Sequence, residues 1–212
     1  MISLSLKQDP LDRDTSKIFK TKQVTFEFER GINVLVGCNG SGKTTVLKCL
    51  ENYCINSNIP IYAYNQLKAK DKITYRLYFE DQLQYMMEER GPELSEGETI
   101  YHRLALLATD LGRFSTKNRE SKSIVFTFDG LDSGWSIDQI DDFYNFVETT
   151  MIPHQPKEQN VYVVIAANMY EFASLCNNNI DVQTGQMVKF NDYEAYKKFI
   201  LNSHKQKENL LI

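Results

Sequence analysis

Residues 32–45, INVLVGCNGSGKTT, are the stretch that decides the fold of this 212-residue chain. The first five residues, Ile32 to Val36, are almost all apolar, which is typical of a strand covered on both faces of a sheet. A glycine-rich segment follows directly. After it, residues 46–54 read VLKCLENYC, in which the apolar residues recur at the spacing of one helix face. The order strand, glycine loop, helix therefore predicts a mixed α/β fold.

Residues 37–44 also fit the pattern G-x-x-x-x-G-K-[ST]. Glycines in such a turn let backbone N–H groups converge on a phosphate, and the dipole of the following helix favours negative charge there. In this pattern Lys43 reaches the β- and γ-phosphates of a nucleotide, and the hydroxyl of Thr44 binds Mg²⁺. The predicted nucleotide-binding residues are Gly37, Cys38, Asn39, Gly40, Ser41, Gly42, Lys43, Thr44 and Thr45.

The composition is that of a globular chain, with 42% hydrophobic and 25% charged residues. The 24 Lys and Arg residues against 28 Asp and Glu residues give a net charge of -4, which argues against a general nucleic-acid binder. No apolar run approaches the ~18 residues of a membrane span, and the N-terminus lacks a signal-peptide pattern. We therefore expect a cytoplasmic protein without a membrane partner. The four cysteines form no CxxC pair, so no zinc site is expected.

Further apolar patterns along the chain indicate strands that alternate with helices. Strands are predicted over 2–6, 24–28, 59–64, 124–128 and 161–166, a hairpin over 180–190, and helices over 79–90, 99–114, 137–150 and from 192 onward. Alternation of this kind favours a mainly parallel central sheet, and the first two strands predict an N-terminal antiparallel β edge. The fold class is thus α/β.

Three motifs together resemble the ATP-binding cassette superfamily, in particular the soluble heads of the SMC, Rad50, RecF and overcoming-lysogenization-defect type. They are GCNGSGKTT at 37–45, LSEGE at 94–98 and FTFDGLDSGWS at 126–136. The resemblance spans residues 32–168 and implies a P-loop NTPase that binds ATP and Mg²⁺. It also implies one ABC-type head domain over residues 1–212, with a reduced helical and signature region over 66–112.

The resemblance assigns roles to further residues. Asp129 takes the place of the Walker B aspartate, a ligand of Mg²⁺. Gln66 takes the place of the Q-loop glutamine, which touches Mg²⁺ and the attacking water; its alternative is an ordinary exposed glutamine. Ser95 and Gly97, in the signature, are expected to bind the γ-phosphate held by an opposite subunit. A plain N-cap, with Glu98 completing a capping box, explains the same residues.

The chain also departs from the family pattern. Gly130 stands where the water-activating glutamate is usual, and Asn168 stands where the H-loop histidine is usual. Loss of a general base costs about 10²- to 10⁴-fold in rate, whereas nucleotide binding does not depend on it. We therefore expect ATP binding with slow or conditional turnover, and a faster Gly130→Glu variant if the loop accepts a side chain. Asp132 and Glu171 are alternative bases. The remaining catalytic candidates are Lys43, Asp129, Gln66 and Asn168.

Several functions remain open. Lys43 and Ser95 lie only 52 positions apart, which leaves no room for coiled-coil arms or a transporter's fuller helical subdomain. The first hypothesis is an ATP-switched homodimer in a DNA-linked process such as repair, recombination or defence, with a protein partner. The second is a hydrolysis-deficient scaffold that regulates a partner such as a nuclease. A small-molecule P-loop kinase would need an arginine-rich lid, and residues 67–90 contain only Arg76 and Arg90.

Two local features allow more than one interpretation. Lys68, Lys70, Lys72 and Arg76 give weak support for nucleic-acid binding, since a charge run is usually a solvated surface. Trp135, the single tryptophan, is either an anchor of the dimer interface or a core residue.

Overall fold

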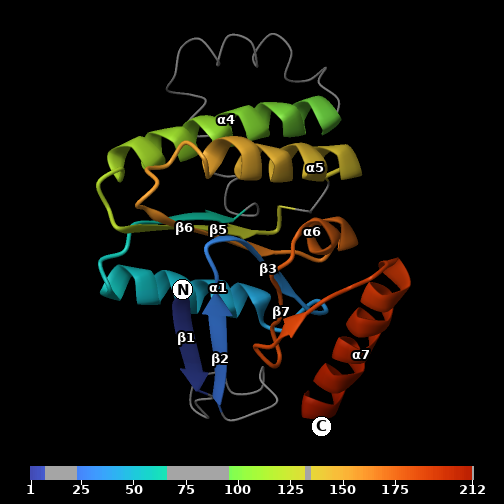
Figure 1. The fold of residues 1–212 in the computed structure, drawn as a ribbon. Coiled ribbons are helices and arrows are strands. Elements are labelled where there is room, and N and C mark those ends of the chain that lie inside the picture. The colour runs from blue at the N-terminus through green and yellow to red at the C-terminus, as the bar shows by residue number, and fades with distance from the viewer. Residues whose placement is uncertain (8–22, 66–95, 132–134, 212) are drawn as a thin grey trace.

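The computed structural model describes residues 1–7, 23–65, 96–131 and 135–211 (Figure 1). The elements are β1 (Ile2–Lys7), β2 (Gln23–Phe28), β3 (Gly31–Val36), α1 (Lys43–Asn56), β4 (Ile61–Asn65), α4 (Glu96–Lys117), β5 (Ser123–Asp129), α5 (Ile137–Asn145), η1 (Phe146–Met151), β6 (Asn160–Ala166), α6 (Tyr170–Leu175), β7 (Asn179–Asp181), β8 (Met187–Val188) and α7 (Tyr193–Leu211).

The central sheet has the strand order β4-β5-β6-β3-β7-β8. All neighbouring strands are parallel except β7 and β8, which form the predicted antiparallel hairpin. The mainly parallel α/β fold is therefore confirmed. The N-terminal strands β1 and β2 pair antiparallel, with Ile2 opposite Phe28, but they form a two-stranded sheet of their own rather than an edge of the central sheet.

Helices cover both faces of the central sheet (Figure 1). Helices α4 and α5 lie on one face, and α1 together with the small β1–β2 sheet lies on the other. Residues of each buried strand alternate between the two cores: Val34 of β3 belongs to the core under α4 and α5, and Leu35 belongs to the core around α1. This alternation explains why the strand pattern in the sequence is a nearly continuous apolar run.

The predicted helix over 137–150 is divided into two parts. Helix α5 ends at Asn145, and the six residues Phe146–Met151 form the π-helix η1. The wider turn is seen in the bond from the Ile152 N–H to the Val147 carbonyl, five residues back. Among the described residues, no helix is both long and apolar enough to cross a membrane.

Part of the predicted helical and signature region lies outside the described residues. This holds for residues 66–95, which include the predicted helix over 79–90. From Glu96 to Lys117 the chain is one helix, α4. Its Leu107 and Leu111 are buried in the core beneath it.

Trp135 packs in the core. Its side chain is 8% exposed and its ring meets Phe143 edge to face at a centroid distance of 5.5 Å. The alternative of an interface anchor is therefore wrong for this residue, because the indole is already covered within the chain.

Candidate nucleotide site

The glycine loop connects β3 to α1 and depends on its glycines. Gly40 and Gly42 have φ values of 71° and 106°, in the left-handed region that side chains with a Cβ avoid. A Cβ on Gly37 would lie 2.6 Å from Ser41 Oγ and 2.9 Å from Val182 Cγ1. The loop is thus too tightly curved for larger residues at these positions.

Lys43, the first residue of α1, folds back into this loop. Its side chain is 8% exposed, and Nζ donates to the carbonyls of Gly37 and Cys38 at 2.6 and 3.0 Å. These bonds hold a positive charge inside the curve of the loop. The Ser41 hydroxyl in the same turn is buried and has no hydrogen-bond partner. A buried hydroxyl without a partner is costly, and a phosphate oxygen in the loop is a group that could satisfy it.

Asp129, the last residue of β5, faces the start of α1. The Thr44 hydroxyl donates to its two carboxylate oxygens at 3.2 and 3.0 Å. The Asn65 side-chain amide donates to the same carboxylate at 2.9 Å. A carboxylate beside a hydroxyl is a set of hard oxygen donors, which Mg²⁺ prefers. Thr44 is exposed, so this pair can be reached from solvent.

Sheet topology explains why these residues meet. Strand β3 leads into the loop, and strand β5 ends at Asp129. These two strands flank β6, and all three run parallel. Their carboxyl ends therefore lie on one edge of the sheet, where α/β folds bind ligands. Asn65 stands directly opposite Asp129 in the register of β4 and β5.

The other predicted site residues are placed as follows. Asn168, just after β6, is exposed, and its carbonyl accepts a hydrogen bond from the Tyr196 hydroxyl at 2.7 Å. Gly97 lies in the first turn of α4. Gln66 and Ser95, and the alternative base Asp132, lie outside the described residues. The structure therefore brings together Lys43 with the loop, and Thr44 with Asp129.

Three contacts at the site were missed in the sequence analysis. Asn65 could have been found, because it ends a strand as Asp129 does and the two strands were both predicted. Ser203 and Lys207 of α7 contact the loop from more than 160 residues away: Ser203 Oγ accepts from the Cys38 N–H at 3.2 Å, and Lys207 Nζ donates to the Asn39 carbonyl at 3.0 Å. No pattern in the sequence pointed to them.

The backbone at position 130 has a conformation that favours glycine. Gly130 directly follows Asp129 and has a φ of 73°. Residues with a Cβ adopt this conformation at a cost of about 1 kcal/mol or more. The chain therefore turns after Asp129 in a way that favours glycine.

Comparison with known proteins agrees with this geometry. A family model described as an AAA domain matches residues 16–210, which is nearly the whole chain. A search among curated proteins gives no significant match. The matched range includes the glycine loop, Asp129 and α7. This match agrees with the loop around Lys43 and with the Thr44–Asp129 pair. The chain belongs to the AAA domain family and is a P-loop ATPase domain.

Proposed function

We propose that the chain is an ATP-binding switch of the ABC-type head class, with slow turnover. The observation that carries the proposal is the arrangement of Lys43 in the curve of the loop with Thr44 and Asp129 at its rim. Backbone amides and an ammonium group suit the phosphates of a nucleotide. The hydroxyl and carboxylate suit the cation that accompanies it.

ATP and Mg²⁺ fit the residues present. The Gly40 amide, the amides from Gly42 to Thr45 and the Lys43 ammonium would hold the phosphates, and Thr44 with Asp129 would hold Mg²⁺. The Ser41 N–H already donates to the Cys38 carbonyl at 3.2 Å. Bound Mg²⁺ neutralises charge on the β- and γ-phosphates. The chain's own contribution is to present its amides to the phosphates and to hold the Asp129 carboxylate in place through the Thr44 hydroxyl and the Asn65 amide.

Gly130 supports slow turnover. A glycine has no group that can orient or polarise water, and general-base catalysis is typically worth about 10²- to 10⁴-fold in rate. The positive φ of Gly130 shows that its loop is shaped for glycine. This observation also favours the second candidate, a hydrolysis-deficient scaffold in which ATP is a structural ligand and the chain regulates a partner such as a nuclease.

The proposal also includes homodimerisation through ATP, a protein partner and a DNA-linked role. Their support is the LSEGE signature at 94–98 and the soluble-head resemblance. An exposed Thr44 leaves the rim of the site open to an approaching second subunit. The kinase alternative rests on residues 67–90, which lie outside the described part of the chain.

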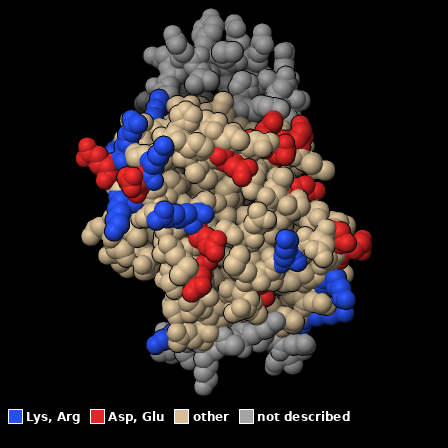
Figure 2. All heavy atoms as spheres, viewed as in Figure 1, with Lys and Arg blue, Asp and Glu red and all other residues tan. Residues whose placement is uncertain are grey.

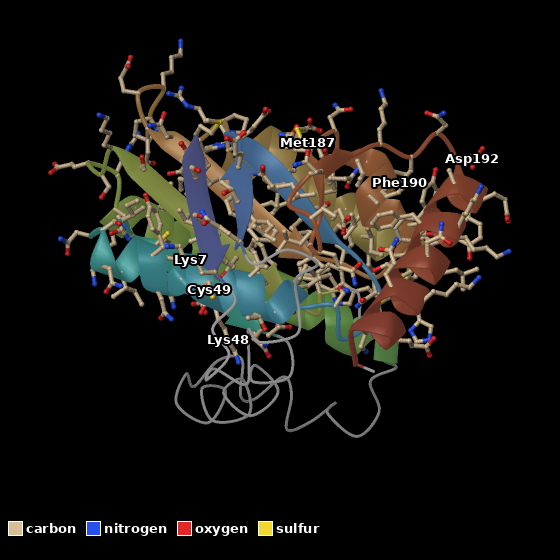
Figure 3. The ribbon with its side chains drawn as sticks, turned by 90° about the horizontal axis from the view of Figure 1, so that it is seen from below. Lys7, Lys48, Cys49, Met187, Phe190 and Asp192 are labelled. Carbon is tan, nitrogen blue, oxygen red and sulfur yellow. The ribbon has the colours of Figure 1, made fainter. Side chains whose placement is uncertain are left out.

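The test is a titration of the purified chain with ATP and Mg²⁺ by calorimetry. Lys43→Ala is expected to weaken binding by about 10- to 100-fold, because charged hydrogen bonds contribute roughly 1.5–3 kcal/mol. Lys48→Ala is the matched control: Lys48 is an exposed lysine on the same helix, and its side chain projects from the outer surface of α1 (Figure 3). Equal affinity of both variants and wild type would contradict the proposal.

A further inference from the structure

Helix α7, the last element of the chain, contacts the outside of the glycine loop at two peptide groups, Gly37–Cys38 and Asn39–Gly40. Ser203 Oγ accepts from the Cys38 N–H at 3.2 Å, and Lys207 Nζ donates to the Asn39 carbonyl at 3.0 Å. The two residues are four positions apart and so share one face of the helix. Ser203 is 3% exposed, although most of α7 is exposed.

These contacts fix the direction of backbone donors. In a trans peptide the carbonyl and the N–H point in opposite directions. In the Gly37–Cys38 peptide, the carbonyl accepts from Lys43 inside the loop and the N–H donates to Ser203 outside it. In the Asn39–Gly40 peptide the carbonyl is held outward by Lys207, so the Gly40 N–H points away from α7. That is the direction in which a phosphate would bind.

The Lys207 ammonium lies close to the backbone at Gly40. A Cβ there would lie 2.7 Å from Lys207 Nζ. The lysine is thus seated against the loop backbone itself. Holding a lysine side chain in one position costs rotamer entropy, and the hydrogen bond to the Asn39 carbonyl offsets part of that cost.

The other half of α7 holds the helix in place. The Tyr196 hydroxyl donates to the Asn168 carbonyl at 2.7 Å, and the Tyr196 ring packs edge to face on Phe190 at 5.1 Å. Figure 3 shows Phe190 beside α7, with Asp192 at the start of that helix. Helix α7 therefore contacts both Asn168, in the segment after β6, and the glycine loop after β3.

We infer that α7 is a brace of the phosphate-binding loop, and that Lys207, helped by Ser203, is a positioning residue for the nucleotide. The inference rests on the proposed ATP binding and deepens it. Lys207 acts by turning the Asn39–Gly40 peptide so that the Gly40 amide is ready for a phosphate. ATP and ADP both place phosphates in the loop, so both should depend on Lys207.

The experiment compares Lys207→Met with Lys205→Met, which removes an exposed lysine from the same helix. Lys207→Met is expected to raise the Kd for ATP and for ADP by about tenfold, and Lys205→Met is expected to leave both unchanged. In the nucleotide-free protein, amide hydrogen exchange over residues 37–42 should be faster in Lys207→Met alone. Lys207→Arg, which keeps a donor and the charge, should restore most of the affinity.

The outcomes separate this inference from the proposed function. If wild type does not bind ATP, the proposed function fails. If wild type binds ATP and Lys207→Met binds it equally well, the brace is wrong even if the melting temperature of the variant falls. If Lys207→Met does not fold, Ser203→Ala serves instead, with about threefold weaker binding expected and unchanged binding contradicting the inference.

Discussion

In the proposed function, Gly130 is the residue on which turnover depends. Its φ is 73°, so a glutamate placed here, directly after Asp129, would strain the backbone. We predict that Gly130→Glu lowers stability by about 1 kcal/mol and does not produce rapid hydrolysis, because a side chain at this position has to adopt a left-handed backbone conformation that residues with a Cβ disfavour. This revises the expectation from the sequence, which depended on a loop that accepts a side chain.

The measurement is steady-state phosphate release together with thermal unfolding. Gly130→Ala is the matched control, since it adds the backbone cost without the carboxylate. Phosphate release at least tenfold faster in Gly130→Glu than in both wild type and Gly130→Ala would show that the loop does hold a working base.

Two buried cysteines give a second prediction at this scale. Burial, aided by the charge of Glu51, raises the pKa of the Cys54 thiol from 9.0 to about 11, and burial raises the pKa of Cys176 to about 11 although backbone hydrogen bonds oppose the change. Both thiols stay protonated in the folded chain at pH values where the unfolded chain loses its thiol protons. Their contribution to stability is full below pH 9 and is lost as the pH rises toward about 11.

The slope should reach at most about 1.4 kcal/mol per pH unit for each thiol over this range. Melting temperatures between pH 8 and 10.5 test the slope, and alkylation followed by peptide mass spectrometry tests each thiol. Cys54 and Cys176 should resist alkylation at pH 8 in the native protein and react once guanidinium unfolds it. Rapid native modification of Cys54, which is 0% exposed, would contradict the prediction.

At the scale of elements, the sequence predicts those features that local pattern controls. The runs at 32–36, 124–128 and 161–166 are buried on both faces and so are almost continuously apolar, with Asn33 and Thr127 as the polar exceptions. Two of these runs end at the glycine loop and at Asp129, and the parallel sheet brings both to one edge. Their shared location could thus be predicted from the sequence, and their binding roles stay predictions. The hairpin of β7 and β8 was also predicted from its turn at Gly185, where φ is 70°.

Features that depend on contacts between distant segments could not be predicted. Periodicity cannot distinguish an antiparallel pair at the edge of a sheet from a separate sheet, as β1 and β2 show. The π-helix η1 follows α5 without any break in the apolar pattern. The contacts of α7 with the loop join residues 165 and 168 positions apart, and their residue types, serine and lysine, are common on exposed helices.

At the scale of the whole molecule, surface charge bears on the nucleic-acid part of the proposal. Figure 2 shows basic and acidic side chains mixed over the face in view, without a continuous basic area among its described residues. Non-specific nucleic-acid binding depends on clustered lysine and arginine. The described residues on this face therefore do not support direct nucleic-acid binding.

The last prediction concerns assembly. If the signature binds a nucleotide held by a second chain, ATP with Mg²⁺ should convert monomers to dimers, and ADP should not, because it lacks the γ-phosphate. Light scattering after gel filtration, at several protein concentrations, measures the mass in each state. Ser95→Arg should abolish the ATP-dependent dimer while ATP affinity stays unchanged, because the added bulk and charge act on the opposite chain's site. Lys43→Ala should abolish the dimer by preventing binding itself. A wild-type chain that binds ATP and remains monomeric at high concentration would exclude the dimer and leave the scaffold function, in which a different protein receives the nucleotide-bound surface.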